Sequence, residues 1–171
     1  SSADAQTRAK NIILLISDGW GYNTILATDY YNNGAANTSP FANFPVYTAM
    51  STYMSYFEDS SGELVGPGGE AVQSKPSLFG YNGTEARSNF DYVGEYYTDS
   101  AAAVTAMASG VKTFQGAIGM GVDRTAAPNI VELANAAGKA TGSISSVQFT
   151  HATPAGFYAH TNYRSDYQYV A

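Results

Sequence analysis

Thr98-Asp99-Ser100-Ala101-Ala102-Ala103 is the stretch around which we expect the rest of the chain to be organised. It reads as a polar turn that leads into a small, alanine-rich helix running to about Gly110. Thr98 or Asp99 can cap this helix, because a side-chain oxygen there accepts a backbone N–H of the first turn. Ser100 then lies where backbone N–H groups and the helix dipole favour an anion. The stretch is therefore either a plain capped helix or a serine placed to receive a phosphate.

Length and composition narrow the possible classes of protein. The 171 residues suffice for one domain with a buried core, and 44% hydrophobic against 13% charged residues excludes a highly charged disordered chain. A net charge of −6 argues against a nucleic-acid-binding surface, which would need a basic face. The absence of cysteine excludes disulfides and thiolate metal sites.

The two ends of the sequence carry signals of their own. Residues 1–6 lack the apolar core of a signal peptide, but they would suit a mature end left after cleavage. Residues 165–171 have a helical pattern that stops without glycine, proline or a cap, which suggests a fragment. No apolar run is long enough to span a membrane, so we expect no membrane association.

Residues 11–16, Asn-Ile-Ile-Leu-Leu-Ile, form a continuous apolar run of the kind found in central parallel strands. The run leads into Asp18, which would lie at the carboxyl edge of the sheet, where α/β proteins place their ligands. A helix is expected over residues 23–32. Asp18 is either the cap of that helix or a metal ligand.

The remaining pattern alternates between strands and helices and predicts an α/β fold, a mostly parallel central sheet with helices on both faces. The whole of residues 1–171 is expected to be the amino-terminal portion of a single domain. The expected segments are a strand over 46–57, a surface excursion over 58–87, an extended piece over 90–93, a helix over 128–137, a strand over 139–145 and a helix over 154–163.

Three predicted strand–helix junctions carry polar groups that one sheet edge can bring together. They supply an oxygen nucleophile and hard oxygen ligands for divalent metals. Arg164, one residue past the last of these helices, adds a guanidinium fork that fits two phosphate oxygens. Phosphoryl transfer needs these parts, because its catalysis is largely positioning and charge neutralisation. The residues are Asp18, Asp99, Ser100, His151, Thr153 and Arg164.

These segments, in this order, resemble the alkaline phosphatases. The matching stretches are residues 11–21, residues 97–102 continuing to 110–113, residues 151–155, and Arg164. The resemblance implies hydrolysis of small phosphate monoesters through a covalent phosphoserine at Ser100, in a periplasmic or secreted enzyme that forms a homodimer.

The resemblance also implies the roles of the other residues and the cofactors, two zinc ions and one magnesium ion. Asp18 would bridge a zinc and the magnesium, and Thr153 would bind the magnesium. Arg164 would hold the phosphate, with Asp99 keeping the arginine in place. Zinc on the Ser100 oxygen would lower its pKa so that an alkoxide attacks phosphorus, and water on the second zinc would cleave the phosphoserine.

The two histidines of the chain have no clear role in the family pattern: His151 departs from it, and His160 lies outside it. Some bacterial members carry aspartate where this chain has His151, and a neutral imidazole should weaken the magnesium site. We expect His151 to act on that site from the second shell or through water, or else to be a plain helix-start residue. His160 fits a helix interior and is expected to be structural.

The family needs further metal ligands from its second half, and neither histidine here matches a zinc ligand. A catalytic zinc normally takes three protein ligands, so 171 residues alone should not build the two-zinc centre. We therefore expect a missing carboxy-terminal half to be required. The alternatives are an inactive phosphate-binding fragment, or a sibling phosphodiesterase or sulfatase, although the sulfatase nucleophile motif is missing.

Overall fold

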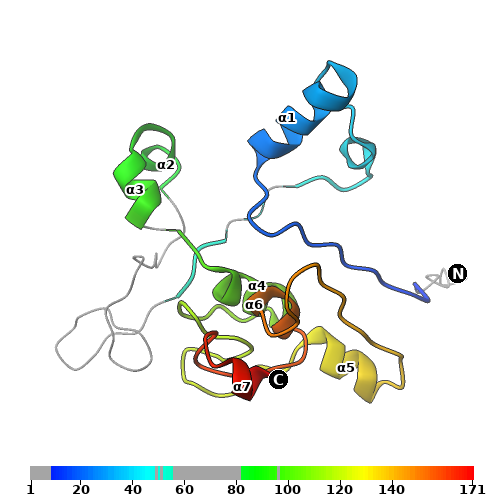
Figure 1. The fold of residues 1–171 in the computed structure, drawn as a ribbon, viewed down its shortest axis with the longest axis vertical. Coiled ribbons are helices and arrows are strands. Elements are labelled where there is room, and N and C mark those ends of the chain that lie inside the picture. Colours follow the sequence, from blue (N-terminus) through cyan, green and yellow to red (C-terminus); the bar gives the residue numbers. More distant parts are fainter. Residues whose placement is uncertain (1–8, 49, 51, 56–81, 96) are drawn as a thin grey trace, which may run out of the picture. The chain divides into compact units, whose positions relative to one another are not determined.

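The computed structural model describes residues 9–48, 50, 52–55, 82–95 and 97–171 (Figure 1). The chain divides into two compact units, Ser1–Tyr47 and Thr48–Ala171, and each is described by itself. The expectation of one domain stays a prediction. None of the helices in the described ranges combines the length and the apolar character needed to cross a membrane.

The first unit contains helix α1, Tyr22–Asn33, close to the bounds expected from the sequence. Gly21 occupies the N-cap position without a side-chain cap. The helix ends at Gly34, whose left-handed backbone lets its N–H bond the Tyr30 carbonyl at 2.9 Å. Asp18 is therefore not the cap of this helix.

A buried carboxylate holds the segment after α1 to the helix. Asp29, which is 2% exposed, accepts the Ser39 hydroxyl and, at 3.3 Å, the Thr38 N–H. Ser39 is the N-cap of the short 3-10 helix η1, Pro40–Asn43. The buried polar side chains of Asp29 and Ser39 are thus hydrogen-bonded to each other, and the turn between α1 and η1 is a defined local structure.

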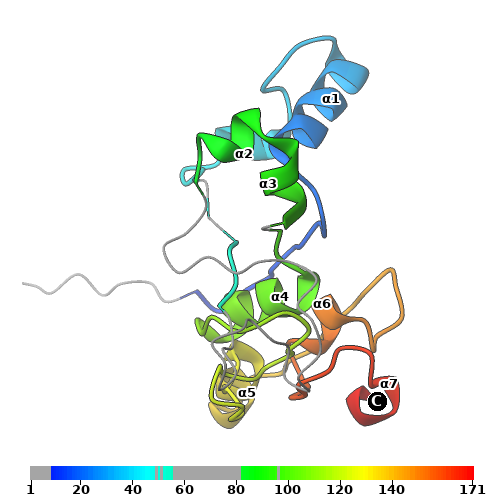
Figure 2. The ribbon, with the colours of Figure 1, turned by 90° about the vertical axis from the view of Figure 1, so that its left-hand side faces the viewer.

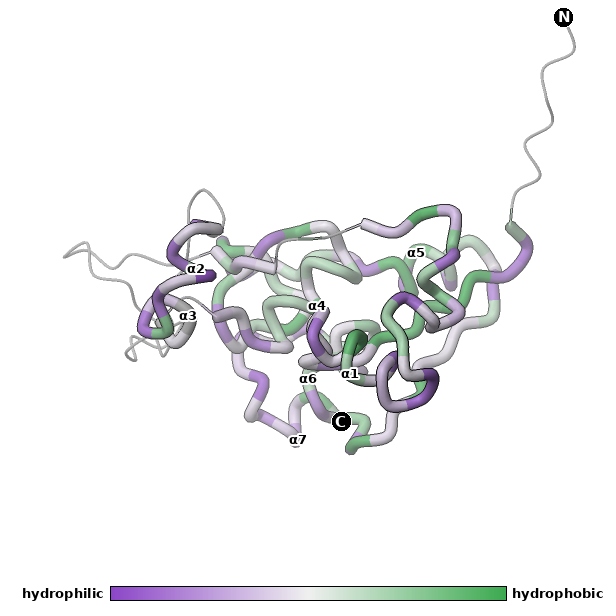
Figure 3. The backbone as a smooth tube through the Cα atoms, turned by 90° about the horizontal axis from the view of Figure 1, so that it is seen from above, coloured by the Kyte–Doolittle hydropathy of each residue, from purple (hydrophilic) through white to green (hydrophobic). Residues whose placement is uncertain are grey.

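The apolar run over residues 11–16 forms no strand in the structure, so the central strand expected at this position is not confirmed. It is visible as a green stretch near the N-terminal end of the tube in Figure 3. Its large side chains are exposed, with Leu15 at 89% and Ile13 at 84%, so it is not covered on both faces. A strand needs neighbouring strands to take its backbone N–H and C=O groups, and the described residues place none beside it.

The second unit holds the other helices of the described residues. Apart from isolated antiparallel bridges at Ile118–Thr161 and Met120–Ala126, the described ranges contain no β pairing, so the predicted parallel sheet is not confirmed. The helices are α2 Glu85–Ser88, α3 Phe90–Glu95, α4 Ser100–Ser109, α5 Ile130–Ala136, α6 Ala152–Ala155 and α7 Tyr167–Val170.

The core of this unit forms where α4 packs against α6, which lie side by side in Figures 1 and 2. Small residues allow the helices to approach closely. A Cβ on Gly156, directly after α6, would overlap the side chain of Val104 in α4. The buried cluster around this contact consists of Ala101, Ile118, Ala152, Ala155, Ala159 and Val170.

Helix α4 confirms the helix expected from the opening stretch. It begins at Ser100 with Asp99 as its N-cap and ends at Gly110, whose φ of 74° is left-handed. Helix α5 confirms the next expected helix, but its N-cap is Asn129, in a capping box with Glu132, rather than a proline start.

Two expectations about helices were wrong. Residues 90–93, expected to be extended, lie in α3, because the Asn89 side chain accepts the N–H groups of Asp91 and Tyr92 and so starts a helix. The helix expected over 154–163 ends at Ala155, since the chain beyond it leaves to pair with residues of another loop.

The structure shows no strand in the described parts of the other two segments predicted as strands, and it describes only the end of the predicted surface excursion. The described parts of 46–57 contain no ladder, although Ser55 donates its N–H to the Thr113 carbonyl at 2.8 Å. Residues 139–145 form no strand, so the strand expected there is not confirmed. Most of the 58–87 excursion lies outside the described residues, and its last part forms a turn and α2.

Candidate active site

Ser100 is the first residue of α4, and its position follows from the cap before it. The Asp99 carboxylate accepts the Ala102 N–H through Oδ1 at 2.9 Å, while the Asp99 carbonyl accepts the Ala103 N–H at 3.0 Å. These bonds fix the first turn of a ten-residue helix. Ser100 is half-buried at the helix end that carries partial positive charge, which favours a bound anion.

The other oxygen of the same carboxylate connects two distant parts of the unit. Asp99 Oδ2 accepts the Gly116 N–H and the Arg164 Nη1, each at 3.1 Å. The Asp99 side chain is 9% exposed and that of Arg164 33% exposed. The carboxylate therefore holds the guanidinium next to the helix start, and part of the arginine still faces solvent.

Arg164 is also held through its backbone. Its N–H donates to the Gly116 carbonyl at 2.8 Å, and just before it Ile118 and Thr161 exchange two backbone bonds of 2.8 Å. The loop that contains Gly116 thus contacts both the arginine and the aspartate. The result is a fork-shaped cation paired with the cap residue that directly precedes Ser100, an arrangement suited to an anion with several oxygens.

Two further residues of the predicted site lie at α6. His151 occupies the N-cap position without a side-chain cap bond, and its ring stacks on Tyr167 with centroids 6.5 Å apart. Thr153 lies inside α6 and is half-buried. Since α6 packs against α4, the helices that carry Thr153 and Ser100 are neighbours.

Asp18 belongs to the first unit. It is exposed and lies in a turn with Gly19, in which Trp20 donates its N–H to the Ser17 carbonyl at 3.3 Å. The proximity of Asp18 to Ser100 stays a prediction.

Comparison with known proteins connects this geometry with a family. The sequence profile described as "Alkaline phosphatase" matches residues 9–171. The chain belongs to the alkaline phosphatase family. It is 35% identical over 159 residues to the alkaline phosphatase of Escherichia coli, covering 93% of this chain and 27% of that protein. It is 32% identical to alkaline phosphatase H of Pseudomonas aeruginosa, covering 95% and 28%.

Other relatives extend the comparison. The streptomycin-6-phosphate phosphatase of Streptomyces griseus is 31% identical over 158 residues, covering 92% of this chain and 28% of that protein. The solved alkaline phosphatase from the Antarctic bacterium TAB5 is 44% identical over 43% of this chain and 22% of its own, with a TM-score of 0.42. A variant of that enzyme was solved with Mg bound. The chain thus spans 27–28% of the length of these curated relatives.

The described residues of this alkaline phosphatase chain do not by themselves make a metal centre. Within the ranges that the structure describes, no three His, Asp or Glu side chains gather closely enough to hold an ion. A catalytic zinc takes about three protein ligands, so the donors Asp18, Ser100, His151 and Thr153 fit only as part of a larger set.

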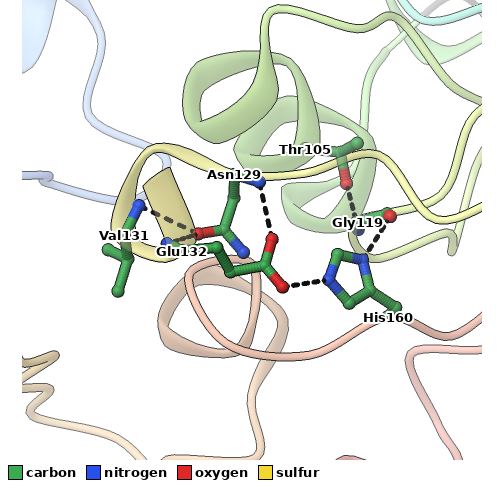
Figure 4. Close-up of polar contacts among 6 residues, drawn as sticks. All are labelled: Thr105, Gly119, Asn129, Val131, Glu132 and His160. Carbon is green, nitrogen blue, oxygen red and sulfur yellow. Dashed lines mark hydrogen bonds and ion pairs between the residues drawn. The ribbon is translucent and has the colours of Figure 1, made fainter. Parts of the chain in front are cut away.

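Sequence reasoning missed Gly116, Glu132 and the contacts of His160. The Asn129-x-x-Glu132 spacing is a capping-box signal that could have located Glu132. His160 is not in a helix interior as expected. Its Nδ1 lies 2.6 Å from the Gly119 carbonyl and its Nε2 2.9 Å from Glu132 Oε1 (Figure 4).

Proposed function

We propose that this chain supplies the nucleophile and the phosphate-binding arginine of an enzyme that hydrolyses phosphate monoesters. Membership of the alkaline phosphatase family supports the reaction class. The observation that carries the assignment is the Asp99 carboxylate, which caps the helix at Ser100 and pairs with Arg164 at 3.1 Å. Serine, helix start and guanidinium are thereby held in one place, as phosphoryl transfer requires.

The chemistry proceeds in two displacements. The Ser100 oxygen attacks phosphorus and gives up its proton to solvent, and the new O–P bond forms as the ester P–O bond breaks. The departing oxygen takes a proton and leaves as an alcohol. Water then attacks the phosphoserine, which releases inorganic phosphate and restores the hydroxyl. In both steps Arg164 binds two phosphate oxygens, and the start of α4 stabilises their charge.

The family resemblance implies two zinc ions and one magnesium ion as cofactors. These ions would neutralise charge on the attacking and leaving oxygens. Asp18, Ser100 and Thr153 would be this chain's ligands, with His151 close to the magnesium. The remaining ligands would come from polypeptide outside the described residues. In that larger protein the exposed apolar run at 11–16 and residues 139–145 would become strands of the parallel sheet, since neither segment is paired with a strand among the described residues.

The substrates we propose are small phosphomonoesters, and a family member named for streptomycin 6-phosphate supports this choice. A homodimer and a periplasmic or secreted location complete the proposal, both from the family resemblance alone.

Substrate comparison tests the reaction class. The purified holoenzyme should hydrolyse p-nitrophenyl phosphate far faster than bis-p-nitrophenyl phosphate or p-nitrophenyl sulfate, and Ser100→Ala should remove the first activity. Ser109→Ala, at the other end of the same helix, is the matched control and should retain it. Preference for the diester or sulfate would favour a sibling hydrolase, while phosphate binding without turnover would favour a binding fragment.

A further inference from the structure

The ring of His160 lies between two hydrogen-bond acceptors (Figure 4). Nδ1 faces the Gly119 carbonyl at 2.6 Å, and Nε2 faces the Glu132 carboxylate at 2.9 Å. A carbonyl has no hydrogen to donate, and neither does an ionised carboxylate. Both ring nitrogens must therefore donate, which makes His160 a cationic imidazolium.

The carboxylate that faces the ring is itself fixed on both oxygens. Glu132 Oε2 accepts the Asn129 N–H at 2.8 Å, while the Asn129 side chain accepts the N–H groups of Val131 and Glu132. The Asn129 bond, and then His160, lower the pKa of Glu132, so the carboxylate is charged. The start of α5 thus presents a rigid anion to the histidine.

The carbonyl on the other side belongs to a loop anchored on α4. Gly119 donates its N–H to the hydroxyl of the buried Thr105 at 2.9 Å, and its carbonyl also accepts the Ala127 N–H at 2.8 Å. Only glycine fits this position. A Cβ there would lie 2.5 Å from the Ala159 carbonyl and 2.6 Å from His160 Nδ1.

The contacts of His160 lead along the chain to Arg164. Directly after the histidine, Thr161 pairs with Ile118 of the same loop, and three residues later Arg164 bonds Gly116. Gly116 in turn donates to Asp99, the partner of the guanidinium. His160 thus joins α5 and the 116–119 loop to the segment that carries the arginine.

We propose that His160, held as an imidazolium between Gly119 and Glu132, is a positioning residue that sets Arg164 for phosphate binding. The proposal rests on the phosphate-binding role of Arg164 proposed above. It adds a residue that touches neither substrate nor the guanidinium, and it acts through the pairing of residues 160–164 with the 116–119 loop.

A double-mutant cycle on the holoenzyme tests the proposal, with the inhibition constant of inorganic phosphate as the measured quantity. His160→Gln should raise this constant about three- to tenfold, a coupling typical of residues in one network. In an Arg164→Ala background the same substitution should change it by less than about twofold. Glu85→Gln, in the first turn of α2, is the control and should have no effect.

A second measurement keeps the test informative if His160→Gln does not fold. Glu132→Gln keeps an oxygen for the cap but removes the charge, and should raise the phosphate constant in the same direction. Nitrogen-15 NMR of the imidazole should show protons on both ring nitrogens at neutral pH, and Glu132→Gln should leave one. A ring with a single proton in the unsubstituted protein would overturn the imidazolium assignment.

The outcomes separate this proposal from the function on which it rests. If Arg164→Ala raises the phosphate constant while His160→Gln and Glu132→Gln do not, the positioning role is wrong and the arginine role stands. Equal effects of His160→Gln in both backgrounds would also overturn the positioning role. If Arg164→Ala has no effect, the proposed arginine role is wrong and the positioning role falls with it.

Discussion

At the scale of single residues, one carboxylate has three partners. Asp99 joins a helix start through the Ala102 N–H, a loop through the Gly116 N–H, and the side chain of Arg164. The cap could be predicted from the sequence, because a polar residue before an alanine-rich run has a local signal. The contact with Gly116 could not, since the two residues are 17 positions apart and no periodic pattern connects them.

Asp99→Asn separates the cap from the ion pair. Asparagine caps helices as well as aspartate does, so the start of α4 should persist. Its amide NH2 cannot accept the Gly116 N–H or the guanidinium, so the free energy of unfolding should fall by about 1–3 kcal/mol. The neutral amide holds the guanidinium less firmly, and the inhibition constant of phosphate should rise several-fold. Urea unfolding and inhibition kinetics measure the two effects. An unchanged phosphate constant would contradict the positioning of Arg164 by this charge.

Protonation of His160 gives a pH dependence with a definite sign. Burial lowers the pKa of His160, but the hydrogen bonds to Gly119 and Glu132 outweigh burial, and the pKa is raised. The stabilisation is complete below the ordinary pKa of histidine and is lost as the pH rises through the raised pKa. On the acid side it is lost as the pH falls through the lowered pKa of Glu132.

We expect the free energies of unfolding of the protein and of His160→Gln to differ most at pH values between the pKa of Glu132 and the pKa of His160. Urea unfolding at a series of pH values from acid to alkaline measures this difference. The Glu132 side chain is 44% exposed, so solvent screens the pair and the difference should be about 1 kcal/mol or less. A difference that is constant from acid to alkaline pH would show that the charge on the histidine does not matter.

At the scale of elements, helices with local start and stop signals were predicted well. Helices α1 and α4 end at glycines with left-handed backbone, and α4 and α5 begin at polar caps. Helix α6 was predicted too long because the chain turns after Ala155 and Thr161 then pairs with Ile118, and such pairing leaves no periodic signal. The predicted strands lack partners in the described residues, and pattern alone cannot supply them.

Gly119→Ala tests the close approach of the loop to the His160 segment. The left-handed backbone at φ 61° and the contact with the Ala159 carbonyl should together cost about 2 kcal/mol or more. Gly142→Ala is the matched control, because a Cβ there meets nothing within 4 Å. Thermal unfolding of both variants is the measurement. Equal melting temperatures would mean that the loop can move away without cost.

At the scale of the whole molecule, metal content distinguishes the proposed enzyme from a phosphate-binding fragment. We expect the active protein to contain about two zinc ions per subunit, because each displacement needs charge neutralised on an entering and a leaving oxygen. Dialysis against a chelator should abolish turnover, and added Zn²⁺ with Mg²⁺ should restore it. Elemental analysis before and after dialysis gives the stoichiometry. Full turnover by protein shown to be metal-free would contradict this expectation.

In the proposed reaction, Ser100 at the start of α4 receives the phosphoryl group. The most direct test is to quench the protein in acid during turnover of a phosphomonoester and to locate the modified peptide by mass spectrometry. We expect one added phosphoryl group on Ser100, absent from Ser100→Ala. A phosphoryl group at another residue, or on the Ser100→Ala protein, would contradict it.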